Sequence, residues 1–173
     1  MSKGKSVMKT LENNFWWISW SILTVAEIVL CIFYYNWAGV RSLTYVGYAL
    51  LAVGFIIGNI AVTTMKKKGN APEGKRWIET TTLVDSGIYA FVRHPQYLSW
   101  IAFSLALILI SQYWIVFVVG VAAMVAVYEQ ARKDDQVLIE KFGPEYENYM
   151  KSVPRMNLLS GFLKLVRDKA RVV

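Results

Sequence analysis

Apolar residues along the chain are gathered into three long blocks, which polar and charged segments separate. The first two blocks, Phe15 to Trp37 and Leu43 to Met65, have 23 residues each, and Glu27 is their only charged residue. The third block runs from Tyr97 to Tyr128 and contains no charge. Because a helix needs about 20 apolar residues to cross a ~30 Å hydrocarbon core, each of the first two blocks predicts one membrane-spanning helix.

The third block has 32 residues, which is too many for one span and few for two. Ser111-Gln112-Tyr113-Trp114 interrupts it near the middle with polar and aromatic residues that are typical of an interfacial turn. We therefore expect a tight hairpin of two short helices, each roughly 24 Å long at ~1.5 Å per residue. The pattern predicts an all-α, polytopic membrane protein with about four transmembrane helices in a single domain, residues 1–173.

Charge is distributed unevenly between the segments that separate the blocks. The chain has 19 Lys and Arg against 12 Asp and Glu, a net charge of +7. If the N-terminus is cytoplasmic, every basic residue except Arg41 falls on the cytoplasmic side, which is the asymmetry that orients membrane helices. We therefore expect both termini to be cytoplasmic, and the charge to face anionic lipid headgroups. No nucleic-acid motif accompanies it.

The connections on the predicted cytoplasmic side are long, whereas the outer ones are short. The first long segment is the connection formed by residues 66–96, and the second is the tail after residue 128. Both are rich in aromatic residues. Since long connections in compact proteins are usually functional or disordered, and the aromatic content argues against disorder, we expect the two to fold together as a cytoplasmic cap. Residues 157–173 are basic and amphipathic, which predicts a helix lying on the membrane surface.

Several kinds of chemistry are excluded by what the chain contains. It has one His and one Cys, His94 and Cys31, so neither a disulfide nor a His/Cys metal centre is expected. There is no Gly-x-Ser-x-Gly elbow, no P-loop and no Gly-x-Gly-x-x-Gly segment. A nucleophilic serine hydrolase and an ordinary nucleotide-binding fold are therefore not expected.

One candidate site lies at the start of the third block, where Arg93, His94 and Pro95 follow one another. Pro95 suits the first turn of a helix, where a missing N–H costs nothing. A helix N-terminus beside an arginine is a good site for a carboxylate or a phosphate. The alternative is that Arg93 lies at the interface and His94 caps the helix, both for structure alone.

A second candidate site lies on the amphipathic helix predicted from Ala122 to Phe142, which Gly143-Pro144 should end. At 100° per residue Asp135 falls on its apolar face and Asp134 at the edge of that face. A carboxylate on a packed face needs a partner. That partner is either Arg132, one turn earlier, or a cationic ligand. Glu27, in the middle of the first span, either binds an acceptor molecule or is a hydrogen-bonded packing residue.

Two segments together resemble a known family: LVDSGIYAFVRHPQYLSW at residues 83–100 and DDQVLIEKFGPEYENYMKSVPR at residues 134–155. They are similar to the isoprenylcysteine carboxyl methyltransferase family and its phospholipid-methyltransferase relatives. The resemblance implies an integral membrane enzyme that uses S-adenosylmethionine and releases S-adenosylhomocysteine. The family's paired Glu falls on Asp134 and Asp135, an Arg that often precedes them is Gln130, and a usual Gly is Ser99.

The resemblance and the residue chemistry together give a candidate site. Arg93 and His94 suit the carboxylate of the cofactor, the two aspartates its ammonium group, and the tyrosines its adenine. The full cofactor-binding set is Tyr89, Arg93, His94, Pro95, Tyr97, Asp134, Asp135, Tyr146 and Tyr149. Arg132, Asp135 and Arg155 are the catalytic candidates, and Glu27 and Arg132 the candidates for binding substrate.

The methyl acceptor implied first by the resemblance is the carboxylate of a prenylcysteine, which would enter from the bilayer. A phospholipid amine or a small isoprenoid acid also fits a site that opens towards lipid. Two other functions stay open. One is an NADPH-dependent sterol reductase of related architecture, and the other is a non-catalytic membrane scaffold. The oligomeric state is not predicted.

Overall fold

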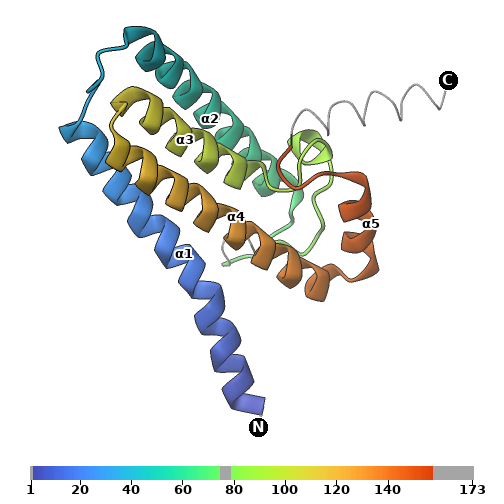
Figure 1. Ribbon diagram of the computed structural model, residues 1–173. Coiled ribbons are helices and arrows are strands. Elements are labelled where there is room, and N and C mark those ends of the chain that lie inside the picture. The colour runs from blue at the N-terminus through green and yellow to red at the C-terminus, as the bar shows by residue number, and fades with distance from the viewer. Residues whose placement is uncertain (1, 75–78, 158–173) are drawn as a thin grey trace, which may run out of the picture. The chain divides into compact units, whose positions relative to one another are not determined.

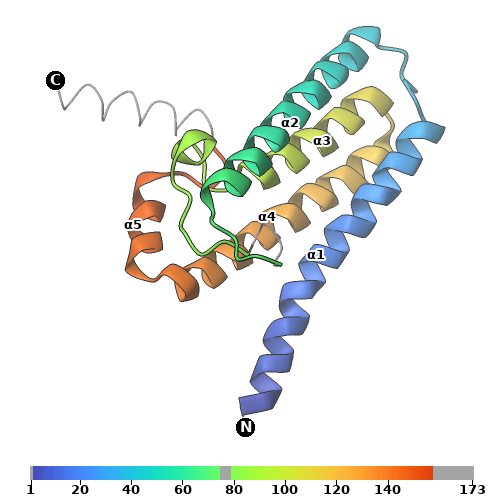
Figure 2. The ribbon, with the colours of Figure 1, turned by 180° about the vertical axis from the view of Figure 1, so that it is seen from behind.

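The computed structural model describes residues 2–74 and 79–157, with side chains from Phe15 onward. Within these residues the regular structure is entirely helical, which confirms the all-α prediction (Figures 1 and 2). The predicted surface helix at residues 157–173 lies almost wholly outside the described residues. The elements are α1 (Ser2–Phe33), α2 (Arg41–Lys68), the 3-10 helix η1 (Gly87–Ala90), α3 (Pro95–Ser111), α4 (Trp114–Phe142) and α5 (Pro144–Ser152).

Three helices of the described chain are long and apolar enough to cross a membrane: α1 from Phe15 to Phe33, α2 and α4. Large apolar side chains on them are exposed, among them Phe33 at 77% and Phe55 at 74%. Such a surface suits lipid and not water. The chain is therefore an integral membrane protein. Helix α3 has 17 residues, about 26 Å at ~1.5 Å per residue, so the number of spans stays a prediction.

The predicted breaks in the helices lie where the sequence places them. Helix α3 begins at Pro95 and ends at Ser111, and α4 begins at Trp114. Gln112 has a positive φ of 58°, which turns the backbone within two residues. Gly143, with φ 56°, separates α4 from α5. Helix α4 is longer than the amphipathic helix predicted from Ala122 to Phe142, because that helix is continuous with the second half of the third apolar block.

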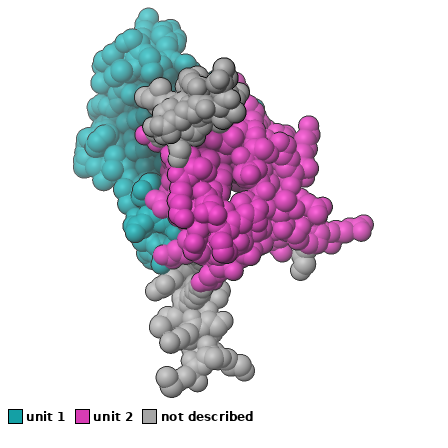
Figure 3. Space-filling view, turned by 90° about the vertical axis from the view of Figure 1, so that its right-hand side faces the viewer, with its two compact units in different colours: residues 1–55, 99–134 teal, residues 56–98, 135–173 magenta. Residues whose placement is uncertain are grey.

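The chain forms two compact units (Figure 3). Unit 1 comprises residues 1–55 and 99–134, and unit 2 comprises residues 56–98 and 135–173. Unit 1 holds most of the apolar helix surface, and its core includes Cys31, Leu107, Ile110 and Val116. Helices approach closely there at glycines. A Cβ on Gly47 would come within 2.6 Å of Ile110 Cγ1, so only glycine fits that contact.

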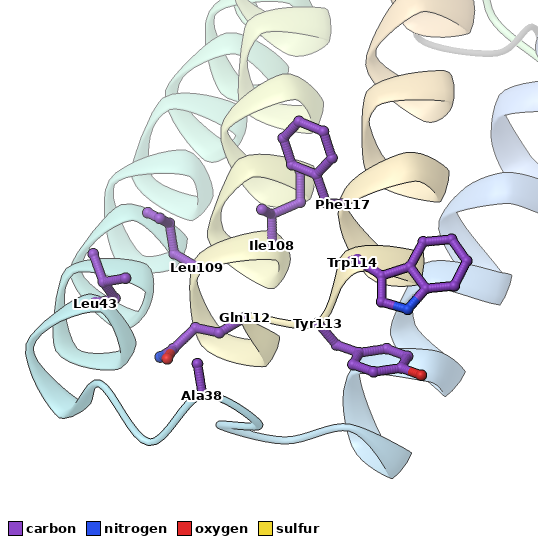
Figure 4. Close-up of a pocket in the computed structure, with 8 residues that line it drawn as sticks. All are labelled: Ala38, Leu43, Ile108, Leu109, Gln112, Tyr113, Trp114 and Phe117. Carbon is purple, nitrogen blue, oxygen red and sulfur yellow. The ribbon is translucent and has the colours of Figure 1, made fainter.

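In unit 1 a polar clasp joins the α1–α2 connection to the α3–α4 turn. Gln112 Nε2 donates to Asn36 Oδ1 at 3.1 Å, Val40 O at 2.9 Å and Thr44 Oγ1 at 3.0 Å, and its Oε1 accepts from Val40 N at 3.0 Å. An open pocket of about 410 Å³ lies beside the clasp (Figure 4). Its lining is mainly apolar and consists of Ala38, Leu43, Ile108, Leu109, Gln112, Tyr113, Trp114 and Phe117.

Unit 2 brings the two long connections together, as predicted. Arg93 N donates to Pro154 O at 3.0 Å and His94 N donates to Arg155 O at 3.1 Å, so the segment before α3 runs beside the segment after α5. Leu83 packs against a core cluster formed by α5 and the end of α4. This unit holds both sequence motifs except for their outermost helical residues, and with them the candidate site.

Candidate active site

The carboxylate of Asp135 is the centre of the candidate site and accepts hydrogen bonds from four side chains. Its Oδ1 accepts from Tyr146 Oη at 2.5 Å and lies 2.7 Å from His94 Nε2. Its Oδ2 accepts from Arg155 Nε at 2.7 Å and from Arg93 Nη2 at 3.3 Å. Asp135 itself is 2% exposed. Because a carboxylate offers about four lone-pair positions, these four contacts satisfy it.

The partners of Asp135 come from three segments that the backbone pairing of unit 2 holds in place. Arg93 and His94 directly precede α3, where Pro95 begins the helix without needing an N–H donor. Tyr146 lies on α5, and Arg155 follows it after Pro154. The two backbone hydrogen bonds between these segments set Arg93 and Arg155 on the same carboxylate oxygen.

The ion-pair cluster carries a surplus of positive charge. Arg93 and Arg155 each contribute +1 and Asp135 contributes −1, so these three side chains sum to +1. Arg93 is 8% exposed, and its Nη1 donates to Met150 O at 3.0 Å. Its Nε is buried and has no hydrogen-bond partner in the described chain. Since an unpaired buried donor is costly, the cluster is suited to an anionic ligand.

Three of the tyrosines predicted for the site are buried in unit 2: Tyr89, Tyr146 and Tyr149. Tyr149 Oη donates to Tyr89 O at 2.6 Å, and the rings of Tyr146 and Tyr149 meet edge to face. Burial raises the pKa of all three phenols above the ordinary value. The hydrogen bond to Asp135 raises the pKa of Tyr146 further. All three therefore stay protonated and serve as donors at neutral pH.

Three other residues predicted to bind cofactor or substrate, Tyr97, Asp134 and Glu27, do not contact Asp135 in the hydrogen bonds described above. The ring of Tyr97 lies 5.7 Å from that of His94, measured between centroids. Asp134 accepts a hydrogen bond from Gln130 Nε2 at 2.8 Å within unit 1. Glu27 is fully buried in unit 1 beside Gly120, and within the described part of the chain neither of its carboxylate oxygens has a hydrogen-bond partner.

Arg132 was one of two partners considered for Asp135, and that pairing is wrong. Its Nη1 donates to Glu129 Oε1 at 2.9 Å, and its side chain is 56% exposed. The carboxylate is instead neutralised by arginines that lie 42 and 20 residues away. Sequence reasoning singled out all the members of the cluster but not their arrangement around one carboxylate. The signal available was an acidic residue on a packed face, which must have buried cationic partners.

The fold and the cluster define a class: helical integral membrane proteins with a buried, positively charged polar site built from loop and helix ends. Residues 55–140 match the model of the isoprenylcysteine carboxyl methyltransferase (ICMT) family. The chain belongs to this family. No solved structure gives a significant match.

Curated relatives share the family name and cover much of the chain. It is 29% identical over 150 residues to the protein-S-isoprenylcysteine O-methyltransferase of Rattus norvegicus, a match that covers 84% of this chain and 45% of the relative. The protein of the same name from Dictyostelium discoideum is 31% identical over 116 residues, 65% of this chain and 48% of the relative. The chain thus spans less than half the length of the curated relatives it matches.

Proposed function

We propose that this protein is an S-adenosylmethionine-dependent membrane methyltransferase that esterifies the carboxylate of a prenylcysteine-type acceptor. The proposal rests on family membership and on one structural observation. The motif residues Arg93, His94, Tyr146 and Arg155 converge on Asp135 in a buried cluster with surplus positive charge. The names of the relatives support this choice of acceptor class.

The residues present fit the cofactor's amino-acid part. Arg93 has a buried Nε that finds no hydrogen-bond partner among the described residues, and it lies beside the N-terminal end of α3, whose dipole favours negative charge. A carboxylate is the ligand that this donor and this charge suit. Arg93 and His94 would therefore hold the cofactor's carboxylate. When bound, S-adenosylmethionine supplies an electrophilic methyl group on a sulfonium.

We assign Asp135 a role other than binding the cofactor's ammonium group, which is the role that the sequence predicts for it. All of its hydrogen-bonding capacity is used by protein donors, so we assign it as a positioning residue that fixes His94 and both arginines. Asp134 then remains the candidate for the cofactor's ammonium group. Tyr146 and Tyr149 support the cluster from α5 through buried hydroxyl groups.

The reaction needs placement more than acid–base chemistry. A carboxylate acceptor is ionised at neutral pH, so its oxygen would accept the methyl group without a general base, and the products would be a methyl ester and a neutral thioether. Holding two reactants in line supplies ~7–11 kcal/mol of the barrier. Arg155, whose side chain is 24% exposed, is the cation we assign to the acceptor carboxylate. Arg132 is already bound to Glu129.

The membrane location sets how the acceptor arrives. Its prenyl chain would enter from the bilayer between apolar helices, and its carboxylate would meet the cofactor at the membrane surface. The positive-inside distribution supports a cytoplasmic site and cytoplasmic termini. Membrane lipids are the other expected partners.

Calorimetric titration of detergent-purified protein with S-adenosylhomocysteine tests the proposal. We expect saturable binding to the wild type, weakened by His94→Ala and by Arg93→Ala. Arg132→Ala is the matched control and should retain the wild-type affinity for this ligand. No binding by folded wild-type protein would overturn the proposal. Binding of NADPH instead would favour the reductase, and binding of neither would favour a scaffold.

A further inference from the structure

One end of unit 1 has the features of a membrane interface. Helix α1 ends at Phe33, α2 begins at Arg41 and α4 begins at Trp114, so three helices that are long and apolar enough to cross a membrane have an end there. Trp and Tyr side chains collect at the level of lipid headgroups in membrane proteins. Five such residues lie in or beside the two connections, namely Tyr34, Tyr35, Trp37, Tyr113 and Trp114. This end of unit 1 therefore lies at the headgroup level.

The pocket beside the polar clasp extends from this interface towards the layer of lipid chains. Its volume of about 410 Å³ falls within the ~300–1,000 Å³ range of ligand sites. Figure 4 shows Leu43 and Leu109 towards one side of the pocket and Trp114 towards the other, with Phe117 between them. Phe117 lies three residues into α4 from Trp114, which is about 4.5 Å deeper at ~1.5 Å per residue. The pocket thus has the position to take part of a lipid chain.

The lining of the pocket suits an apolar occupant. The amide of Gln112 is used by the polar clasp, in which it bonds Asn36, Val40 and Thr44. Trp114 and Phe117 are 66% and 56% exposed, so the protein leaves their rings uncovered. Because an unfilled apolar hollow forfeits dispersion contacts, a hydrocarbon chain from the bilayer is the occupant that this lining favours.

The headgroup end of the pocket carries one charge, that of Arg41. This residue begins α2 two positions before Leu43 and is exposed. It is the only charged residue between Glu27 and Lys66, and residues 97–128 contain none. An arginine stem can lie along apolar surface while its guanidinium stays among headgroups, where it attracts lipids of net negative charge. The ammonium group of a zwitterionic lipid would find no carboxylate at this end, so an anionic headgroup is favoured.

We propose that this pocket binds one acyl chain of an anionic phospholipid whose phosphate pairs with Arg41. The lipid would join the beginning of α2 to the turn between α3 and α4, next to the polar clasp. All of the residues involved belong to unit 1, and the inference does not depend on the proposed methyltransferase function.

Fluorescence of Trp114 tests the proposal, because bromine atoms on a lipid chain quench an indole that they touch. Full-length protein in neutral detergent is titrated with phosphatidylglycerol or phosphatidylcholine that carry the same brominated chains. The signal of Trp114 is the difference between proteins with and without Trp114→Phe. We expect half-maximal quenching of Trp114 at about fivefold less phosphatidylglycerol than phosphatidylcholine, the size of effect typical of one basic residue near anionic lipid.

Two variants separate the charge from the pocket. Arg41→Gln should make the two lipids equally effective, whereas Ala38→Phe, which places a ring in the lining, should weaken quenching by both. Lys66→Gln is the matched control, since it removes one exposed charge about 37 Å away along α2 at ~1.5 Å per residue, and it should leave the preference intact. Equal quenching of the wild type by the two lipids, or an unchanged preference in Arg41→Gln, would overturn the proposal. Quenching by neither lipid would also overturn it and would favour a second copy of the chain as the occupant.

Discussion

His94 Nε2 lies 2.7 Å from Asp135 Oδ1, and both side chains are more than nine-tenths buried. The two residues are 41 positions apart, one immediately before α3 and the other in the last third of α4. Their contact joins the two sequence motifs of the family inside unit 2. It also explains why the two motifs together are more specific than either motif alone, since neither contains both partners.

Replacing Asp135 should damage stability and ligand binding together. Asp135→Asn leaves Arg93 and Arg155 without their buried counter-charge, and breaking a buried pair typically costs ~3–5 kcal/mol. We expect a lower melting temperature in detergent and loss of S-adenosylhomocysteine binding. Glu129→Gln, which removes the half-buried partner of the exposed Arg132, is the control and should cost less than about 1 kcal/mol. A stable Asp135→Asn protein that binds normally would contradict the positioning role.

Much of the fold was predictable because its signals are local. Pro95 fixes a helix start, and the polar residues at Ser111 and Gln112 interrupt an apolar run, so the turn between α3 and α4 follows from chemistry within a few residues. The cluster around Asp135 was not predictable in the same way. Arg132 was attractive by spacing alone, whereas the true partners are brought in by backbone pairing between Arg93 and Pro154, which no short-range pattern encodes.

The tyrosine hydroxyl groups should make stability fall at alkaline pH. Burial raises the pKa of Tyr146 and Tyr149 above the value near 10 that the unfolded chain has. The folded state therefore holds these protons more tightly than the unfolded state does. The contribution of the two phenols to the free energy of unfolding is complete below pH ~10 and is lost as the pH rises further. Melting temperatures measured from pH 8 to pH 11 should decline at the upper end.

Lysines titrate in the same range, so the comparison with Tyr146→Phe isolates the phenol. The variant lacks the titrating group and should show a shallower decline above pH 10, from a lower starting stability. The lower start is expected because Asp135 loses a donor at 2.5 Å, and an unpaired buried acceptor costs ~1–3 kcal/mol. Parallel pH profiles for the two proteins would show that Tyr146 does not contribute to the decline.

Gly120 should be intolerant of a side chain because Glu27 and Ile108 fill the space beside it. A Cβ there would meet Ile108 Cδ1 at 2.8 Å as well as the Glu27 carboxylate. Overpacking of this kind typically costs ~1–3 kcal/mol. We expect Gly120→Ala to lower the melting temperature, and Glu27→Ala to recover part of the loss in the double variant. Strict additivity of the two changes would argue against their contact.

The polar clasp at Gln112 should matter for stability and not for ligand binding. Gln112→Leu removes three donated hydrogen bonds and one accepted hydrogen bond that join the α3–α4 turn to Asn36, Val40 and Thr44. With a net worth of ~0.5–1.5 kcal/mol for each bond, the variant should melt several degrees lower. Its affinity for S-adenosylhomocysteine should equal that of the wild type, because the cluster around Asp135 belongs to unit 2. Phe117→Leu, which alters the adjacent apolar pocket without touching the clasp, should melt closer to the wild type. A Gln112→Leu protein with wild-type stability but weakened binding would reverse the assignment and give the clasp a part in the ligand site.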